Sequence, residues 1–264
     1  MTPDAAEAPV FVPAPGAAPL RRMIAAQAAL ETRTLLRNGE QLLLTLVIPL
    51  LLLAAFGLEP LVNFDAGMSR IDFLTPGIIA LAVMSTAFTS QAIATGFERR
   101  YGVLKRLGAT PLSRQGLIAA KTVTVIAVEL LQGALILIVA VAIGWRPDAS
   151  PSAVVVVPLL ILLGTAAFSG LALLMAGTLR AEANLAAANA LFLVFLFLGG
   201  MAYPLDKLPG ALQAIAKLLP AAALTDTVRS VLSTQPFPTG QFVVLVAWAV
   251  GAPLAAARWF RWEE

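Results

Sequence analysis

Long apolar stretches, interrupted by short polar segments, follow one another along the chain from residue 41 onward. Six of them come close to the roughly 20 residues that an α-helix needs to cross about 30 Å of hydrocarbon. They cover residues 41–58, 73–96, 117–144, 153–179, 185–203 and 240–257. The pattern predicts an all-α integral membrane protein whose six transmembrane helices form a transmembrane domain over residues 41–264.

The chain ahead of the first apolar stretch divides into two parts. Residues 1–19 are rich in Pro and Ala and have no periodicity, which is typical of a disordered arm. Within residues 20–40, three arginines fall on one face of a helix: Arg22, Arg33 and Arg37. Gln27 and Glu31 interrupt the apolar face opposite them. We expect an amphipathic helix on an anionic membrane surface, with a solvated helix leading into the first span as the alternative.

A semi-apolar segment, residues 204–239, separates the fifth and sixth stretches. Pro209 and Pro220 break it into pieces that are too short to cross a membrane. This favours an external insert of two short helices that lie on the outer leaflet or dip into it. An ordinary amphipathic cap is the alternative.

The composition also indicates a lipid environment, because 59% of the residues are hydrophobic and 12% are charged, whereas soluble proteins carry about 25% charged residues. Cysteine and histidine are absent, which excludes disulfides, thiolate chemistry and histidine metal ligands. No G-x-x-x-x-G-K-[ST] motif for nucleotide phosphates occurs. We therefore expect no metal site and no catalytic residue. The net charge of +3 is too small to indicate nucleic-acid binding.

The positions of Lys and Arg predict the orientation in the membrane. Twelve of them lie on the same side as the amino terminus, and five lie on the opposite side: Arg70, Arg146, Lys207, Lys217 and Arg229. Cytoplasmic loops carry the excess of basic residues. The chain is therefore expected to have both termini in the cytoplasm.

The most informative polar segment is residues 97–114, FERRYGVLKRLGATPLSR. A helix is expected from Glu98 to Leu107, and Gly108 and Pro111 stop it. Three residues would form an apolar patch on this helix with basic side chains around it: Val103, Leu104 and Leu107. Such a helix suits docking into a groove on a partner protein. In the alternative interpretation the basic residues only obey the positive-inside rule and the leucines contact lipid.

At these residues the sequence resembles a family. Glu98-Arg99, Gly102, Leu104, Leu107, Thr110-Pro111-Leu112 and Arg114 are similar to the E-R-x-x-G-x-L-x-x-L-x-x-T-P-L-x-R loop of type-2 ABC exporter permeases. The resemblance extends to an amphipathic helix, six spans and a helical external insert. Arg100 and Lys105 depart from it, because many relatives carry acidic residues there.

The resemblance implies a bacterial plasma-membrane protein whose loop docks as a coupling helix into a separate P-loop ATPase. Two permease copies, as a homodimer, would associate with two ATPase subunits, which bind the ATP and Mg²⁺, while this chain binds no cofactor. The residues that would form or shape the joint are Glu98, Arg99, Gly102, Val103, Leu104, Leu107, Thr110 and Pro111.

Two polar residues lie inside the third predicted span, Glu129 and, about one turn further, Gln132. A charge at that depth costs about 2.5–3.5 kcal/mol, so Glu129 should face protein or water. Thr89 and Gln91 belong to a polar stripe on the second span. These four residues are candidates for a substrate path. Alternatively, they hold the helices together by hydrogen bonds.

The function that these observations favour is that of a permease subunit of an ATP-driven efflux system. Spans with few fixed charges suit a hydrophobic or amphipathic cargo, such as a drug, an antibiotic or a lipid, leaving the cytoplasm or the inner leaflet. One alternative is a secondary transporter or channel that uses a gradient through Glu129. The other is a membrane scaffold that transports nothing.

Overall fold

The computed structural model describes residues 16–39, 43–58, 69–201, 203–233 and 235–261, and every regular element among them is helical. This confirms the all-α fold. The elements are α1 (Leu20–Arg37), η1 (Leu43–Val47), α3 (Ile48–Leu58), α4 (Arg70–Met84), η2 (Ser85–Ser90), α5 (Gln91–Arg100), α6 (Val103–Gly108), α7 (Arg114–Ala142), α8 (Ala153–Thr178), α9 (Ala181–Leu198), η3 (Leu205–Lys207), α10 (Gly210–Ala216), α11 (Pro220–Val231) and α12 (Thr239–Trp259).

Five helical segments are long and apolar enough to cross a membrane: Arg70–Arg100, Gln115–Ala142, Ala153–Thr178, Ala181–Leu198 and Thr239–Trp259. They correspond to the second to sixth predicted spans. The first is represented by the shorter apolar helix Thr45–Gly57, and the flanking residues 40–42 and 59–68 lie outside the described ones. So do residues 1–15, on which most of the predicted disordered arm falls.

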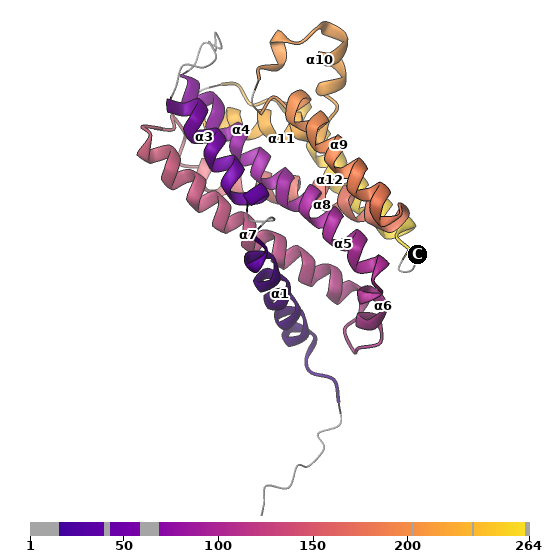
Figure 1. Cartoon of the computed structure of the whole chain (residues 1–264). Helices are drawn as coiled ribbons and strands as arrows, with labels where there is room; N and C mark the ends of the chain where they lie inside the picture. The colour runs from indigo at the N-terminus through magenta and orange to yellow at the C-terminus, as the bar shows by residue number, and fades with distance from the viewer. Residues whose placement is uncertain (1–15, 40–42, 59–68, 202, 234, 262–264) are drawn as a thin grey trace, which may run out of the picture.

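The helices form an elongated bundle with two distinct ends (Figure 1). α6 and the carboxyl-terminal part of the chain lie at one end, which we call the α6 end, and α10 lies at the other, the α10 end. α4, η2 and α5 follow one another without a break and connect the two ends through the bundle (Figure 1). A displacement of α6 therefore has a direct path along one rod to the α10 end.

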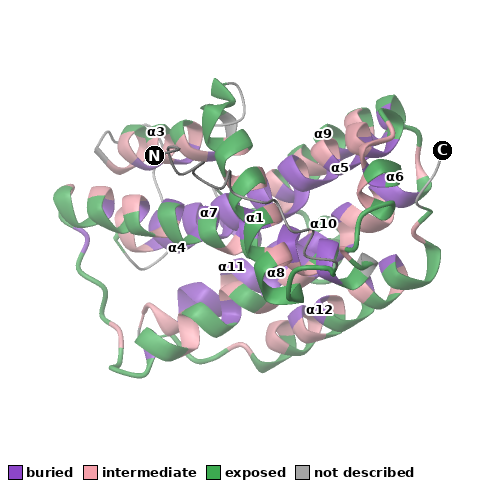
Figure 2. Ribbon diagram, turned by 90° about the horizontal axis from the view of Figure 1, so that it is seen from below, coloured by how far each residue is buried: buried purple, intermediate pink, exposed green. Residues whose placement is uncertain are grey.

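The core of the bundle lies around α4, where every residue from Phe73 to Met84 is buried. Figure 2 shows exposed residues along the outward faces of the other helices. Large apolar side chains are among the exposed ones, for example Leu159, Phe197 and Leu254. A soluble protein would bury such side chains, whereas lipid solvates them. Close packing comes from small residues, since a Cβ atom at Gly170 of α8 would collide with the Pro253 nitrogen of α12.

The insert between the fifth and sixth spans contains the two short helices that the sequence predicts, and they differ in burial. α10 is mostly exposed, with Leu212 and Ile215 among its exposed side chains. Ten of the twelve residues of α11 are buried, because α11 packs against α4, α8 and α12. α11 is therefore part of the bundle, whereas α10 lies on its surface.

Candidate functional site

The turn between α5 and α6 differs from the single helix expected from Glu98 to Leu107. α5 ends at Arg100, and Gly102 has a φ of 68°, so the helix stops and α6 starts anew at Val103. Residues with a side chain rarely adopt this left-handed conformation, whereas glycine adopts it readily. The glycine in the motif thus sets the angle between α5 and α6, and it is the residue from which two helices, rather than the single expected one, could have been predicted.

The apolar patch expected on α6 points partly into the bundle. Leu104 is 2% exposed, Val103 and Leu107 are half-buried, and Lys105 and Arg106 are exposed. The expected outward patch of Val103, Leu104 and Leu107 is wrong for Leu104, because the apolar side of this short helix anchors it to the bundle. The surface that α6 offers to a partner is its basic side.

The segment after α6 is shaped by its own hydroxyls. The Thr110 hydroxyl donates a 2.6 Å hydrogen bond to the Leu107 carbonyl and accepts one from the Leu112 N–H at 3.3 Å. Ser113 then caps α7 by accepting a hydrogen bond from the Gly116 N–H at 3.1 Å. Thr110 and Pro111 are both exposed beside this turn.

Arg99 was expected among the basic side chains around the apolar patch of α6, but its side chain is buried. Its Nη1 donates to the carbonyl oxygens of Ala176, at 2.5 Å, and Leu179, at 3.1 Å. A guanidinium there satisfies carbonyls that the end of α8 leaves without helical partners. Arg99 thus fixes the end of α5 to the end of α8, directly before the turn into α6.

Glu98 is paired within the chain at this same end. The Lys121 Nζ on α7 lies 2.6 Å from a Glu98 oxygen and 3.5 Å from a Glu31 oxygen on α1. Gln27 donates a 2.8 Å hydrogen bond to Glu31. Both polar residues that interrupt the apolar face of α1 therefore belong to this polar contact between helices. One ammonium group joins α1, α5 and α7.

Two π-helical segments meet at Gln132, in the middle of α7. The Thr86 hydroxyl of η2 donates to the Gln132 side-chain oxygen at 2.9 Å, and the Gln132 amide donates to the Thr45 carbonyl of η1. π-helical turns inside helices occur often at functional sites. Here a single side chain joins the only two such segments in the described part of the chain.

The other candidates for a substrate path are Glu129, Thr89 and Gln91, and in the described part of the chain hydrogen bonds do not join them to Gln132. Thr165 of α8 donates a 2.6 Å hydrogen bond to one oxygen of Glu129, and the second oxygen is buried without a partner among the described residues. The Thr89 hydroxyl and both polar atoms of the Gln91 side chain are likewise buried without a hydrogen bond there. No hydrogen bond among the described residues joins Thr89 or Gln91 to Glu129.

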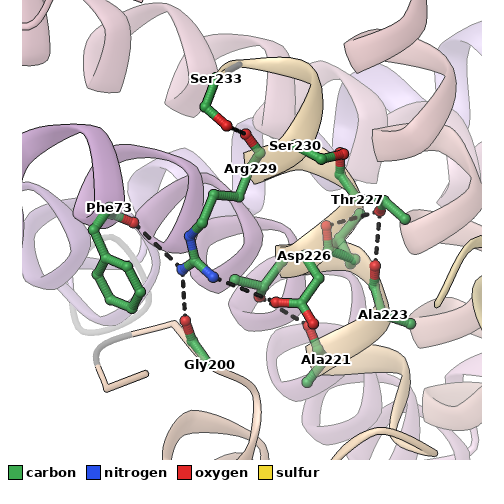
Figure 3. Close-up of polar contacts among 11 residues, drawn as sticks. Phe73, Gly200, Ala221, Ala223, Asp226, Thr227, Arg229, Ser230 and Ser233 are labelled. Atoms are coloured by element: carbon green, nitrogen blue, oxygen red, sulfur yellow. Dashed lines mark hydrogen bonds and ion pairs between the residues drawn. The ribbon is translucent and has the colours of Figure 1, made fainter. Parts of the chain in front are cut away.

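A cluster around Arg229 on α11 was not predicted from the sequence. Its Nη2 donates to the carbonyl oxygens of Gly200, at 2.6 Å, and Phe73, at 3.3 Å, while its Nη1 lies 3.3 Å from Asp226 (Figure 3). The guanidinium also lies 4.0 Å from the centre of the Phe73 ring. An Asp and an Arg three residues apart in an apolar segment were the signal for this cluster.

Burial shifts the pKa values of both charged residues in the Arg229 cluster. Burial lowers the pKa of Arg229 to about 10, against the effect of the nearby Asp226, so the guanidinium stays charged at neutral pH. Burial also raises the pKa of Asp226, and Arg229 and Lys217 oppose that shift. The charged Arg229 joins α11 to the start of α4 and to the turn after α9.

Comparison with known proteins places this arrangement in a family. Residues 25–233 match the family model described as ABC-2 type transporter. The chain belongs to the ABC-2 type transporter family. It is therefore a multi-pass membrane subunit of an ABC transporter.

Curated relatives of this ABC-2 subunit share between a quarter and a third of its residues. The Porphyra purpurea protein ycf38, named as a putative transport permease, is 29% identical over 80% of this chain and 74% of its own length. YbhS of Escherichia coli K12, named as a probable multidrug ABC transporter permease, is 27% identical over 71% of this chain but only 50% of its own length. Nodulation protein J of Rhizobium meliloti is 27% identical over 68% of each chain.

A first prediction for this ABC-2 subunit concerns Glu129. Glu129→Gln keeps an oxygen that can accept the hydrogen bond from Thr165, so we expect ATP-driven transport to change by less than about fivefold. The measurement is uptake of fluorescent hydrophobic dyes into inverted membrane vesicles, energised either with ATP or with a pH gradient. Complete loss of transport at a normal level of inserted protein would instead identify Glu129 as a site for the driving ion.

Proposed function

We propose that the chain is the permease of an ATP-driven exporter that moves a hydrophobic or amphipathic molecule, such as a drug, an antibiotic or a lipid, out of the cytoplasm or the inner leaflet. Two copies would associate with two separate ATPase subunits, which bind ATP and Mg²⁺. Family membership supports the ATPase partner, and the name of the Escherichia coli relative supports a drug-like cargo.

The observation that carries the proposal is how α6 is held. Its basic side is exposed at the end of the bundle. The rod of α4, η2 and α5 leads directly into it through the Gly102 turn. Arg99 and Glu98 fix that rod to α8 and α7 just before the turn. A partner that pushes α6 therefore moves packed helices as a body, which alternating access requires.

The same arrangement supports the proposed orientation. α6 and the carboxyl-terminal part of the chain lie at one end (Figure 1), where the ATPase subunits would bind in the cytoplasm. α10 would then lie outside a bacterial plasma membrane, and both termini inside. The excess of basic residues on the amino-terminal side supports this orientation.

The experiment is affinity purification of the tagged chain from its host membranes in mild detergent. Lys105→Glu with Arg106→Glu reverses two exposed charges of α6. We expect this double variant to recover at least about tenfold less ATPase, because a groove that binds the basic side of α6 would be acidic and would repel the reversed charges.

The matched control reverses two exposed basic residues elsewhere, Arg146→Glu with Lys207→Glu. It should recover as much ATPase as the unmodified chain. Equal recovery from the α6 variant and the control would show that α6 is not the docking surface. Recovery of no ATPase even from the unmodified chain would favour the gradient-driven alternative.

A further inference from the structure

A cavity of about 510 Å³ lies within the subunit, lined by residues of α5, α6, α7, α8 and α12. Its walls are mainly apolar and include Ile118 and Ile126 of α7, Leu162 of α8 and Ala257 of α12. Ile118 is 40% exposed and Leu162 is 45% exposed, so the cavity opens on the apolar outer surface. Its volume falls in the range of sites that hold drug-sized molecules, about 300–1,000 Å³.

Two hydroxyl groups in this wall have no partner among the described residues. Thr95 of α5 is 1% exposed and Ser169 of α8 is 7% exposed, and neither hydroxyl makes a hydrogen bond to any described residue. An unpaired buried hydroxyl costs free energy that a hydrogen-bonding ligand would recover. Thr95 and Ser169 belong to different helices, and both residues line the same cavity.

The charge of the wall selects among possible ligands. Lys121 is the charged residue among those described as lining the cavity, and its ammonium is already paired with Glu98 and Glu31. The two carboxylates do not line the cavity themselves, and they already neutralise this ammonium, so the wall offers no free charge of either sign to a ligand. The wall therefore suits a molecule whose polar part is uncharged.

The cavity is also connected to α6. Leu104, the buried anchor of that helix, forms part of the wall. A displacement of α6 must change the shape of the cavity, and by linkage an occupant of the cavity must bias the position of α6.

From these contacts we propose that the cavity binds an uncharged amphipathic molecule, with a hydrophobic chain or ring system and a hydroxyl or carbonyl group that meets Thr95 and Ser169. The molecule enters from the surrounding lipid at the opening beside Ile118 of α7 and Leu162 of α8. That this occupant is the transported cargo rests on the exporter function proposed above, but binding itself does not require the ATPase.

The test is photolabelling of the full chain in host membranes with a long-chain alcohol that carries a diazirine. The fatty acid of the same chain length with the same diazirine is the anionic comparison. Labelled peptides are identified by mass spectrometry. We expect the alcohol to label peptides of α7, α8 and α12 around the cavity, and the fatty acid to label them at least about fivefold less.

Two sets of variants show whether the label comes from the cavity. Ala166→Phe fills the cavity from α8, whereas Ala127→Phe adds the same bulk to an exposed position of α7 outside it. We expect about tenfold less labelling in the first and no change in the second.

Thr95→Val with Ser169→Ala removes both hydroxyls and should reduce labelling by at least about fivefold.

Equal labelling of the Ala166→Phe and Ala127→Phe proteins would overturn the site, as would equal labelling by the alcohol and the fatty acid. Absence of labelling in the unmodified chain would overturn the proposed site too, since another protein would then cover the opening of the cavity. These results do not depend on the ATPase. If the ATPase co-purifies but labelling fails, only the proposed binding site is rejected. If labelling is specific but no ATPase co-purifies, only the proposed exporter function is rejected.

Discussion

Replacement of Arg229 by alanine is expected to destabilise the protein by about 3–5 kcal/mol, because it leaves the half-buried Asp226 without its cation and also leaves two buried carbonyl oxygens without their donor. The change removes the donor to the carbonyl oxygens of Phe73 and Gly200 and the cation beside Asp226. It also releases α11 from the start of α4. The measurement is the fraction of protein that stays monodisperse on size-exclusion chromatography after heating.

The loss should depend on pH, because Asp226 remains in the variant. Burial raises the pKa of Asp226, and Arg229 opposes that shift, so the pKa rises further when Arg229 is removed. A carboxyl group whose folded-state pKa lies above its unfolded value is stabilising when protonated and loses that contribution as the pH rises. The Arg229→Ala protein should therefore lose less stability at about pH 5 than at about pH 8.

Two further variants separate the causes of this loss. Asp226→Asn in the Arg229→Ala background removes the uncompensated carboxylate and should recover part of the stability at neutral pH. Ser233→Ala removes only a 2.8 Å hydrogen bond to the Arg229 carbonyl and should cost about 1 kcal/mol or less. If Arg229→Ala is no less stable than the Ser233 control, the cluster does not hold α11 in place.

The spans could be predicted from the sequence because length and apolarity are local properties. The apolar stretches at 117–144 and 153–179 correspond to α7 and α8 within a few residues. The insert was also predictable from its prolines. Pro209 directly precedes α10, and Pro220 is the first residue of α11. The burial of α11 was not predictable, because its amphipathic pattern fits a membrane surface as well as a groove between helices.

The partners of the buried polar residues could not be predicted, because they depend on which helices pack together. Lys121 meets Glu98 and Glu31, and Gln132 meets Thr86 and Thr45, across large separations in the sequence. The π-helical segments have no signature in composition or period. Leu104 was assigned to an outer surface because periodicity shows which residues share a face but not what that face contacts.

Replacement of Lys121 by methionine should have the second large effect, at the α6 end. Methionine keeps an apolar stem of similar length but leaves the carboxylates of Glu31 and Glu98 without the cation between them. We expect a loss of about 2–4 kcal/mol, below the full cost of a broken buried pair because both carboxylates retain some solvent contact. The same heating assay on size-exclusion chromatography measures this loss.

The loss of transport should exceed what the loss of stability explains. Glu98 lies in the last turn of α5 before the Gly102 turn, so without Lys121 the rod is no longer fixed where α6 begins. We expect ATP-driven transport to fall by about tenfold in the protein that remains folded. The measurement is transport per inserted molecule in vesicles that contain the ATPase.

A triple variant distinguishes charge balance from fixation of the rod. Lys121→Met with Glu31→Gln and Glu98→Gln removes all three charges, so stability should return while the link between α1, α5 and α7 stays weakened. Transport should then remain low. Recovery of transport together with stability would show that the lysine only neutralises two carboxylates, and that α6 transmits its motion through the Arg99 contacts to α8.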